Sequence, residues 1–211
     1  MKKTALNVPN TLSLIRCLLV PVFVATLLLM KDIKIWGIVV PTIIYILTGL
    51  TDMLDGKIAR KYNLITDFGK FLDPVADKFM VIGTMFVILY KFENFRTAMI
   101  IATMIVVFRE LAVTSMRLVV STGQNIVVAA NKLGKIKTVS QIVAISTIFL
   151  EPVLQYVIVR VYNMLSENHF KYYAGSIVPL SWITLIFSIV MTVWSGINYI
   201  RSYWKYIGSD K

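Results

Sequence analysis

The sequence predicts an all-α integral membrane protein, built as a bundle of six transmembrane helices. Hydrophobic residues make up 57% of its 211 residues, against about 45–50% in an average soluble domain. Charged residues make up only 16%, so much of the apolar surface should face lipid. Apolar runs long enough to cross about 30 Å of hydrocarbon recur along the chain. We expect spans at about residues 12–30, 35–51, 71–90, 97–120, 133–159 and 177–200.

The first three runs carry polar or helix-bending residues whose positions matter for the prediction. Arg16 interrupts the first run, and Pro21 lies within it. The second helix is expected to continue one or two turns past Asp52, to Arg60. Asp67 is expected to cap the third helix, because Asp is a favoured residue before the first helical turn. These three helices would form a continuous up-and-down path.

The fifth run contains Glu151 and Pro152, and the sequence leaves two interpretations open. In the first interpretation, the membrane helix ends near residue 150, and Pro152 lies in the first turn of an external amphipathic helix. Alternatively, one kinked helix continues and buries the carboxylate. The links between all the runs are too short for a soluble domain, so we expect residues 1–211 to form a single membrane domain.

The positive charges predict the orientation in the membrane. Lys and Arg number 22 and Asp and Glu 11. On a six-span path, 16 of the 22 Lys and Arg residues fall on the face that holds both termini. The positive-inside rule therefore predicts cytoplasmic termini in a multi-pass protein of the cell membrane. In such a hydrophobic chain, the excess of positive charge indicates lipid headgroups or phosphorylated substrates rather than nucleic acid.

Four aspartates at the expected cytoplasmic ends of the second and third helices are candidate metal ligands. Asp52 and Asp55 are three residues apart, and Asp73 and Asp77 are four apart, so each pair shares one face of its helix. If the two faces meet, four carboxylates converge at the membrane boundary. Carboxylate oxygens suit Mg²⁺ or Mn²⁺, and aspartates in membrane segments are costly unless they have a function. One Cys and one His leave no basis for a disulfide or a Cys/His metal site.

Small and cationic residues beside the aspartates suggest a neighbouring ligand pocket. Gly56 and Ala59 would let a bulky ligand approach the helix backbone, and Arg60 offers a fork for a phosphate group. Gly69 lies between the two aspartate pairs, where a tight turn is plausible. These residues extend the candidate site beyond the metal ligands.

The whole pattern, D-x2-D-G-x2-A-R-x8-G-x3-D-x3-D, resembles the signature of the CDP-alcohol phosphotransferase family, with every fixed position matched. The resemblance implies transfer of a phosphatidyl group from a CDP-linked lipid to an alcohol, with release of CMP. It also implies a site with two divalent ions at the cytoplasmic face, and a homodimer. The implied metal ligands are Asp52, Asp55, Asp73 and Asp77, with Asp77 also the general base; the implied CDP-lipid contacts are Asp52, Gly56, Ala59, Arg60 and Gly69.

Cations on the fourth and fifth helices are candidates for binding the phosphate of the acceptor alcohol. Arg109, Arg117, Lys135 and Lys137 can each bind a phosphate. Lys135 and Lys137 point about 200° apart on a helix, so only one of them should face the cavity. The structural alternative is that Arg109 merely pairs with Glu110 or another helix, and that the other cations follow the positive-inside rule.

Three short stretches resemble bacterial family members that make phosphatidylglycerophosphate: residues 8–16, 108–111 and 134–138. This resemblance implies CDP-diacylglycerol and sn-glycerol 3-phosphate as substrates. The alternatives are another acceptor, such as inositol phosphate, serine or phosphatidylglycerol, or a function from another class, a divalent-cation transporter. A transporter site usually lies near the midplane rather than at one end of the helices.

Overall fold

The computed structural model is an all-helical bundle of six α-helices and one 3₁₀ turn. It describes residues 7–30, 36–62, 66–124, 132–165 and 178–204, and the side chains of these residues except 8–9, 50, 52–61, 67, 70 and 121–124. The elements are α1 (Val8–Leu29), α2 (Trp36–Lys61), α3 (Asp67–Lys91), η1 (Glu93–Phe95), α4 (Arg96–Gln124), α5 (Lys132–Leu165) and α6 (Pro179–Tyr203). The expected set of six helices is confirmed.

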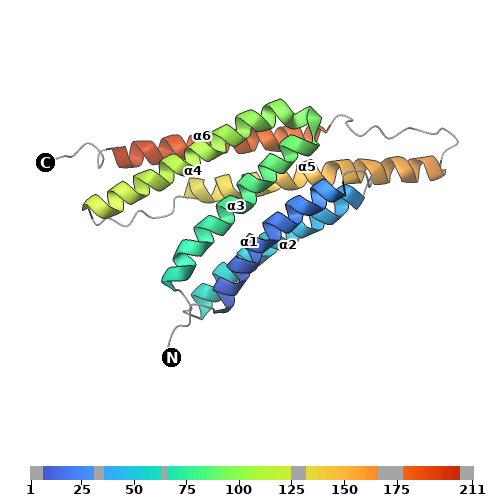
Figure 1. The fold of residues 1–211 in the computed structure, drawn as a ribbon. Coiled ribbons are helices and arrows are strands. Elements are labelled where there is room, and N and C mark those ends of the chain that lie inside the picture. The colour runs from blue at the N-terminus through green and yellow to red at the C-terminus, as the bar shows by residue number, and fades with distance from the viewer. Residues whose placement is uncertain (1–6, 31–35, 63–65, 125–131, 166–177, 205–211) are drawn as a thin grey trace.

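Successive helices run in alternating directions, so alternate ends gather on one side of the molecule (Figure 1). The starts of α1, α3 and α5 and the ends of α2, α4 and α6 lie toward the lower and left parts of the view. Helix α1 packs against α2 and α3, and α6 packs against α4 and α5; contacts of α3 with α4 and of α2 with α5 join the two groups. The aspartate-bearing end of α2, the aspartate-bearing start of α3 and the end of α4 therefore lie on the same side as the start of α1 and the end of α6.

Within the part of the chain that the structure describes, four helical segments are long and apolar enough to cross a membrane by themselves: Asn10–Leu29, Glu93–Val120, Lys132–Leu165 and Pro179–Tyr203. Helix α2 has a shorter apolar part, Trp36–Gly49, before its aspartates begin. Large apolar side chains cover the outside of the bundle, for example Met104 and Phe108 on α4 and Ile183 on α6. An apolar outer surface of this kind suits contact with lipid.

The starts of α1 and α3 are each capped by the side chain of the residue just before the helix, and one of these two caps corrects a prediction. The Asn7 side chain accepts a hydrogen bond from the Asn10 N–H at 3.0 Å at the start of α1. At the start of α3 the cap is Thr66, whose Oγ1 accepts a hydrogen bond from the Gly69 N–H at 3.0 Å. The prediction that Asp67 is the cap was wrong by one residue, because Thr66 has the extended backbone of a cap and Asp67 is already helical.

Helix α5 is continuous through Glu151 and Pro152, so the structure selects the second interpretation of this region. Glu151 is buried, and its two carboxylate oxygens accept hydrogen bonds from the Leu180 N–H at 3.2 Å and the Ser181 N–H at 2.7 Å. The Ser181 hydroxyl donates a third bond, at 2.6 Å. Because these N–H groups lie in the first turn of α6, the carboxylate caps that helix from outside.

The apolar core lies where α1, α2, α3 and α5 meet. Phe23 packs edge-on against Phe149 with ring centroids 5.8 Å apart, and Phe92 approaches Phe149 from another side at 5.6 Å. Tyr45 completes the cluster at 5.9 Å from Phe23. These interlocked rings fix the spacing of the helices that carry the candidate site.

Candidate active site

The expected metal ligands divide between two helices whose ends lie on the same side of the bundle (Figure 1). Asp52 and Asp55 lie near the end of α2, and that helix continues past them to Lys61, as predicted. Asp73 and Asp77 lie on α3, whose first residue is Asp67. Residues 62–66 are the whole link between the two helices. The two aspartate-bearing segments therefore lie at the same end of the bundle, and the meeting of their acidic faces stays a prediction.

The side chains of Asp52, Asp55, Gly56, Ala59 and Arg60 lie outside the described residues, although their backbone is helical. Among the side chains that the structure describes, no group of three or more His, Cys, Asp or Glu residues is gathered around one point. The structure thus describes the side chains of two of the four expected ligands, Asp73 and Asp77.

Asp73 is held by a residue that the sequence reasoning missed. The Ser13 hydroxyl on α1 donates a hydrogen bond to Asp73 Oδ1 at 2.6 Å. Ser13 is fully buried, and Arg16, three residues further along the same helix, is fully buried as well. Helix α1 therefore presents a polar face to α3. The signal in the sequence was the spacing of three between Asn10, Ser13 and Arg16 within an otherwise apolar run.

Gly69 lies inside the first turn of α3 rather than in a tight turn, which corrects the expected local structure. A Cβ on this residue would lie 2.5 Å from Asn10 Oδ1 on α1. Asn10 in turn donates a hydrogen bond from Nδ2 to Thr66 Oγ1 at 2.7 Å. The glycine thus permits close contact between α1 and α3 at the start of the site, while its expected contact with a CDP-lipid stays a prediction.

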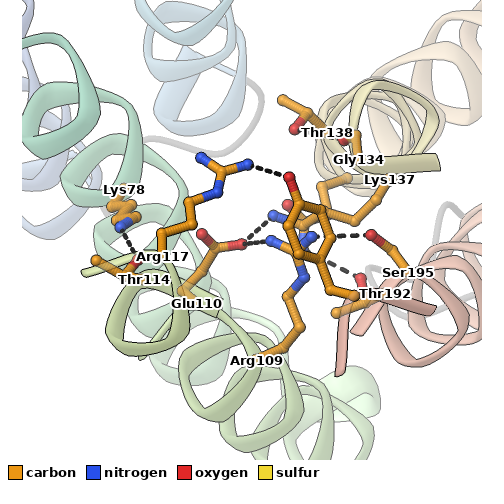
Figure 2. Close-up of polar contacts among 12 residues, drawn as sticks. Lys78, Arg109, Glu110, Thr114, Arg117, Gly134, Lys137, Thr138, Thr192 and Ser195 are labelled. Carbon is orange, nitrogen blue, oxygen red and sulfur yellow. Dashed lines mark hydrogen bonds and ion pairs between the residues drawn. The ribbon is translucent and has the colours of Figure 1, made fainter. Parts of the chain in front are cut away.

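A second polar cluster lies between α4, α5 and α6, and we name Arg109, Glu110, Arg117 and Lys137 the cation cluster (Figure 2). Glu110 Oε1 accepts a hydrogen bond from Arg109 Nη1 at 3.0 Å and forms an ion pair with Lys137 Nζ. The structural alternative for Arg109, pairing with Glu110, is therefore observed. The pairing also joins the arginine to a second candidate cation on another helix.

Helix α6 supplies the other partners of the two arginines. Arg109 Nη2 donates a hydrogen bond to Ser195 Oγ at 2.8 Å, and Arg117 Nη2 donates one to Tyr199 Oη at 2.5 Å. The guanidinium carbons lie 5.9 Å and 5.1 Å, respectively, from the centroid of the buried Tyr199 ring. Tyr199 thus holds both arginines on one aromatic ring through cation–π contacts.

Of the two candidate lysines, Lys137 points into the bundle and Lys135 does not. Lys137 is buried, whereas Lys135 is exposed at the start of α5. Helix α3 reaches the same part of α4, because Lys78, the residue after Asp77, donates a hydrogen bond from Nζ to Thr114 Oγ1 at 2.7 Å. Thr114 lies one helical turn from Glu110 on α4, so a phosphorylated ligand bound at the cation cluster would lie on the side of α4 that meets the motif-bearing helix α3.

Comparison with known proteins agrees with the motif. The sequence model of the CDP-alcohol phosphatidyltransferase family matches residues 6–200. The chain belongs to this family.

Several curated relatives have the same name, CDP-diacylglycerol--glycerol-3-phosphate 3-phosphatidyltransferase. The relative from Bacillus subtilis (strain 168) is 42% identical over 156 residues, covering 68% of this chain and 77% of the relative. The relatives from Salmonella typhimurium and Escherichia coli K12 are each 32% identical over 198 residues, covering 93% of this chain and 94% of the relative. Similarity to these family members thus extends over most of the chain.

Proposed function

We propose that this protein transfers the phosphatidyl group of CDP-diacylglycerol to sn-glycerol 3-phosphate, giving phosphatidylglycerophosphate and CMP. The activity for which the relatives are named supports this assignment. The observation within the fold that carries it is the cation cluster: buried Lys137 pairs with Glu110, and one turn further along α4 Thr114 accepts a hydrogen bond from Lys78, the residue after Asp77. A phosphate held by these cations brings its own alcohol group toward the aspartate motif.

In the proposed reaction, a hydroxyl oxygen of glycerol 3-phosphate attacks the phosphorus atom that carries the diacylglycerol. A new P–O bond forms as the P–O bond to the cytidine phosphate breaks, and CMP leaves with the electron pair of that bond. Asp77 takes the proton of the attacking hydroxyl. The two acyl chains stay in the bilayer, because the aspartates lie at the ends of apolar helices.

The described part of the aspartate motif fits divalent metal ions. Asp73 and Asp77 are four residues apart on α3 and share a face. The Ser13 hydroxyl donates a hydrogen bond to Asp73 Oδ1 and so fixes the orientation of the carboxylate. Hydrogen bonds from residues around a metal site orient its ligands in the same way. With Asp52 and Asp55 from α2, these residues would hold two Mg²⁺ or Mn²⁺ ions. Such ions, when bound, stabilise the charge on the entering and leaving oxygens.

The phosphate of the acceptor is assigned to Arg109, Arg117 and Lys137. Two guanidinium groups and one ammonium group offer donors of the kind that phosphate oxygens accept. They come from α4 and α5, and α6 holds both arginines through Ser195 and Tyr199. Lys135 is left out of the proposed site because its side chain is exposed.

We also propose that all six helices cross the membrane as one domain, with both termini and the site at the cytoplasmic face. The supports are the alternating helix directions (Figure 1) and the concentration of Lys and Arg on the side of the termini. Labelling of single cysteines placed near each terminus, in intact cells, tests this orientation. A homodimer stays a prediction from the family resemblance, and native mass spectrometry in detergent tests it.

The test of the function is CMP release by the full chain, purified in detergent and given CDP-diacylglycerol with Mg²⁺ or Mn²⁺. Glycerol 3-phosphate, inositol phosphate, serine and phosphatidylglycerol are offered separately. We expect release that depends on glycerol 3-phosphate and on metal, is lost with a chelator, and is abolished in Asp77→Asn. Release with another acceptor alone would overturn the assigned acceptor but keep the family reaction. No release with any acceptor would overturn the proposal.

Two matched lysine variants test the assigned phosphate site. Lys137→Gln and Lys135→Gln remove the same charge from positions two residues apart on α5. We expect the KM for glycerol 3-phosphate of Lys137→Gln to be more than ten times that of Lys135→Gln. Equal effects would contradict the assignment of the buried lysine.

A further inference from the structure

Glu110 on α4 shares one carboxylate oxygen between two cations that come from different helices. Its Oε1 contacts Arg109 Nη1 at 3.0 Å and forms an ion pair with Lys137 Nζ, which belongs to α5 (Figure 2). Since both donors reach the same oxygen atom, the guanidinium and the ammonium group lie side by side. The carboxylate thus fixes the distance between two groups that the proposed function assigns to one phosphate.

The three charges are poorly solvated, so their mutual interactions are only weakly screened. Their side chains expose 10% (Arg109), 14% (Glu110) and 7% (Lys137) of their surface. Two like charges that share one carboxylate oxygen repel each other strongly where water is scarce. A carboxylate between them offsets this repulsion, and its removal leaves a buried ammonium group without its ion-pair partner.

Two residues of α6 hold Arg109 in this arrangement. The Ser195 hydroxyl accepts a hydrogen bond from Arg109 Nη2 at 2.8 Å. Gly196, the next residue on α6, leaves room for the stem of the arginine, since a Cβ there would lie 3.1 Å from Arg109 Cγ. Arg109 is therefore fixed by α6 on one side and by Glu110 on the other. Glu110 also contacts Lys137, which lies on the neighbouring helix α5.

We propose that Glu110 is a positioning residue of the acceptor-phosphate site, which holds Arg109 and Lys137 at the spacing at which both bind one phosphate group. The inference rests on the proposed function and adds to it the group that arranges the cations. Because Arg109, Lys137 and Arg117 carry three positive charges against one on Glu110, the cluster keeps a net positive charge for a phosphate dianion. Glu110 acts through the two cations and touches neither the alcohol nor the CDP-lipid.

The first test compares the full chain with Glu110→Gln, which keeps the size of the side chain and removes its charge. We expect the KM for glycerol 3-phosphate to rise at least tenfold, with the KM for CDP-diacylglycerol and the kcat at saturating acceptor within about twofold of the parent. The matched control is Glu93→Gln, which removes a carboxylate paired with Arg96 whose side chain is 80% exposed. An acceptor KM that stays unchanged would overturn the proposal. A fall in that KM would also overturn it, because Glu110 would then compete with the substrate.

The second test is a double-mutant cycle with Lys137→Gln. If Glu110 acts through Lys137, the Glu110→Gln change should raise the acceptor KM much less in the Lys137→Gln background than in the parent. Full additivity would overturn the proposal, since it would mean that the carboxylate acts independently of the lysine. The double variant should also melt at a higher temperature than Glu110→Gln, because it no longer buries an unpaired ammonium group. This comparison of melting temperatures remains decisive if Glu110→Gln folds poorly. A double variant whose Tm equals or falls below that of Glu110→Gln would overturn the pairing.

The parent enzyme separates a failure of this inference from a failure of the proposed function. Acceptor-dependent CMP release by the parent establishes the reaction before any variant is compared. If glycerol 3-phosphate supports no release by the parent, the assigned acceptor is wrong, and the inference falls with it. If the parent is active and Glu110→Gln keeps its acceptor KM, the inference alone is wrong.

Discussion

Replacing Gly69 with alanine should destabilise the contact between α1 and α3. A Cβ at this position would lie 2.5 Å from Asn10 Oδ1 and 3.3 Å from Thr66 Oγ1. Asn10 is buried and its Nδ2 donates a hydrogen bond to Thr66 Oγ1 at 2.7 Å, so the side chain cannot withdraw without breaking that bond. Asn10 must therefore shift, and the cap of α3 shifts with it.

The magnitude follows from three contributions. Overpacking of a close contact costs about 1–3 kcal/mol, and loss of the hydrogen bond between Asn10 and Thr66 costs about 0.5–1.5 kcal/mol. The better helix propensity of alanine offsets up to about 1 kcal/mol. With the full offset the net loss is about 0.5–3.5 kcal/mol, which corresponds to a fall in Tm of roughly 1–14 °C for a chain of this size.

Gly134 provides a matched control for helix propensity. Gly69 is the third residue of α3 and Gly134 the third residue of α5, and a Cβ on Gly134 would meet no atom within 4 Å. Thermal unfolding in detergent, followed by tryptophan fluorescence, should therefore give an unchanged or higher Tm for Gly134→Ala and a lower Tm for Gly69→Ala.

Equal stability of the two variants would refute this reasoning. If Gly69→Ala also kept its Tm but raised the KM for CDP-diacylglycerol, the glycerol backbone or nucleotide of the substrate would be what needs the space at Gly69. The two readouts thus separate a helix-packing role from a role in binding the CDP-lipid.

Two further predictions concern hydrogen bonds to carboxylates. Ser13→Ala removes the 2.6 Å hydrogen bond to Asp73, so we expect the Mg²⁺ or Mn²⁺ concentration for half-maximal CMP release to rise about 10-fold or more; an unchanged metal requirement would contradict the proposed orientation of Asp73. Glu151→Gln removes the buried charge that accepts three hydrogen bonds from the start of α6, so we expect the free energy of unfolding to fall by about 1.5–3 kcal/mol. Thermal unfolding checks this against the exposed Glu93→Gln, and equal Tm values in the two variants would rule out the capping role.

The helices and the motif were largely predictable because they depend on local patterns. Apolar runs predicted all six helices, and the continuation of α2 beyond Asp52 was confirmed to Lys61. The 200° angle between Lys135 and Lys137 predicted that one lysine faces inward, and the structure identifies it as Lys137. The capping residue of α3 was missed by one position, because Thr66 and Asp67 both have side chains suited to a cap.

The partners of the cation cluster were not predictable because they depend on how distant helices meet. Arg117 and Tyr199 are 82 residues apart, and Ser195 is 86 residues from Arg109. Serine and tyrosine in an apolar helix do not reveal which neighbour they face until the packing of α4 against α6 is known. Glu110 was visible beside Arg109, but its ion pair with Lys137 required the placement of α5 as well.

The buried carboxylate of Glu151 has a consequence for how the bundle can move. Glu151 is hydrogen-bonded to α6 at Ser181, and Arg109 is hydrogen-bonded to the same helix at Ser195. These points are 14 residues apart, about 21 Å along the helix axis. A slide of α6 by one helical turn, about 5.4 Å, would break the bonds at both points together. Helix α6 is therefore locked in register against α4 and α5, so opening of the site for substrate exchange would have to come from other helices.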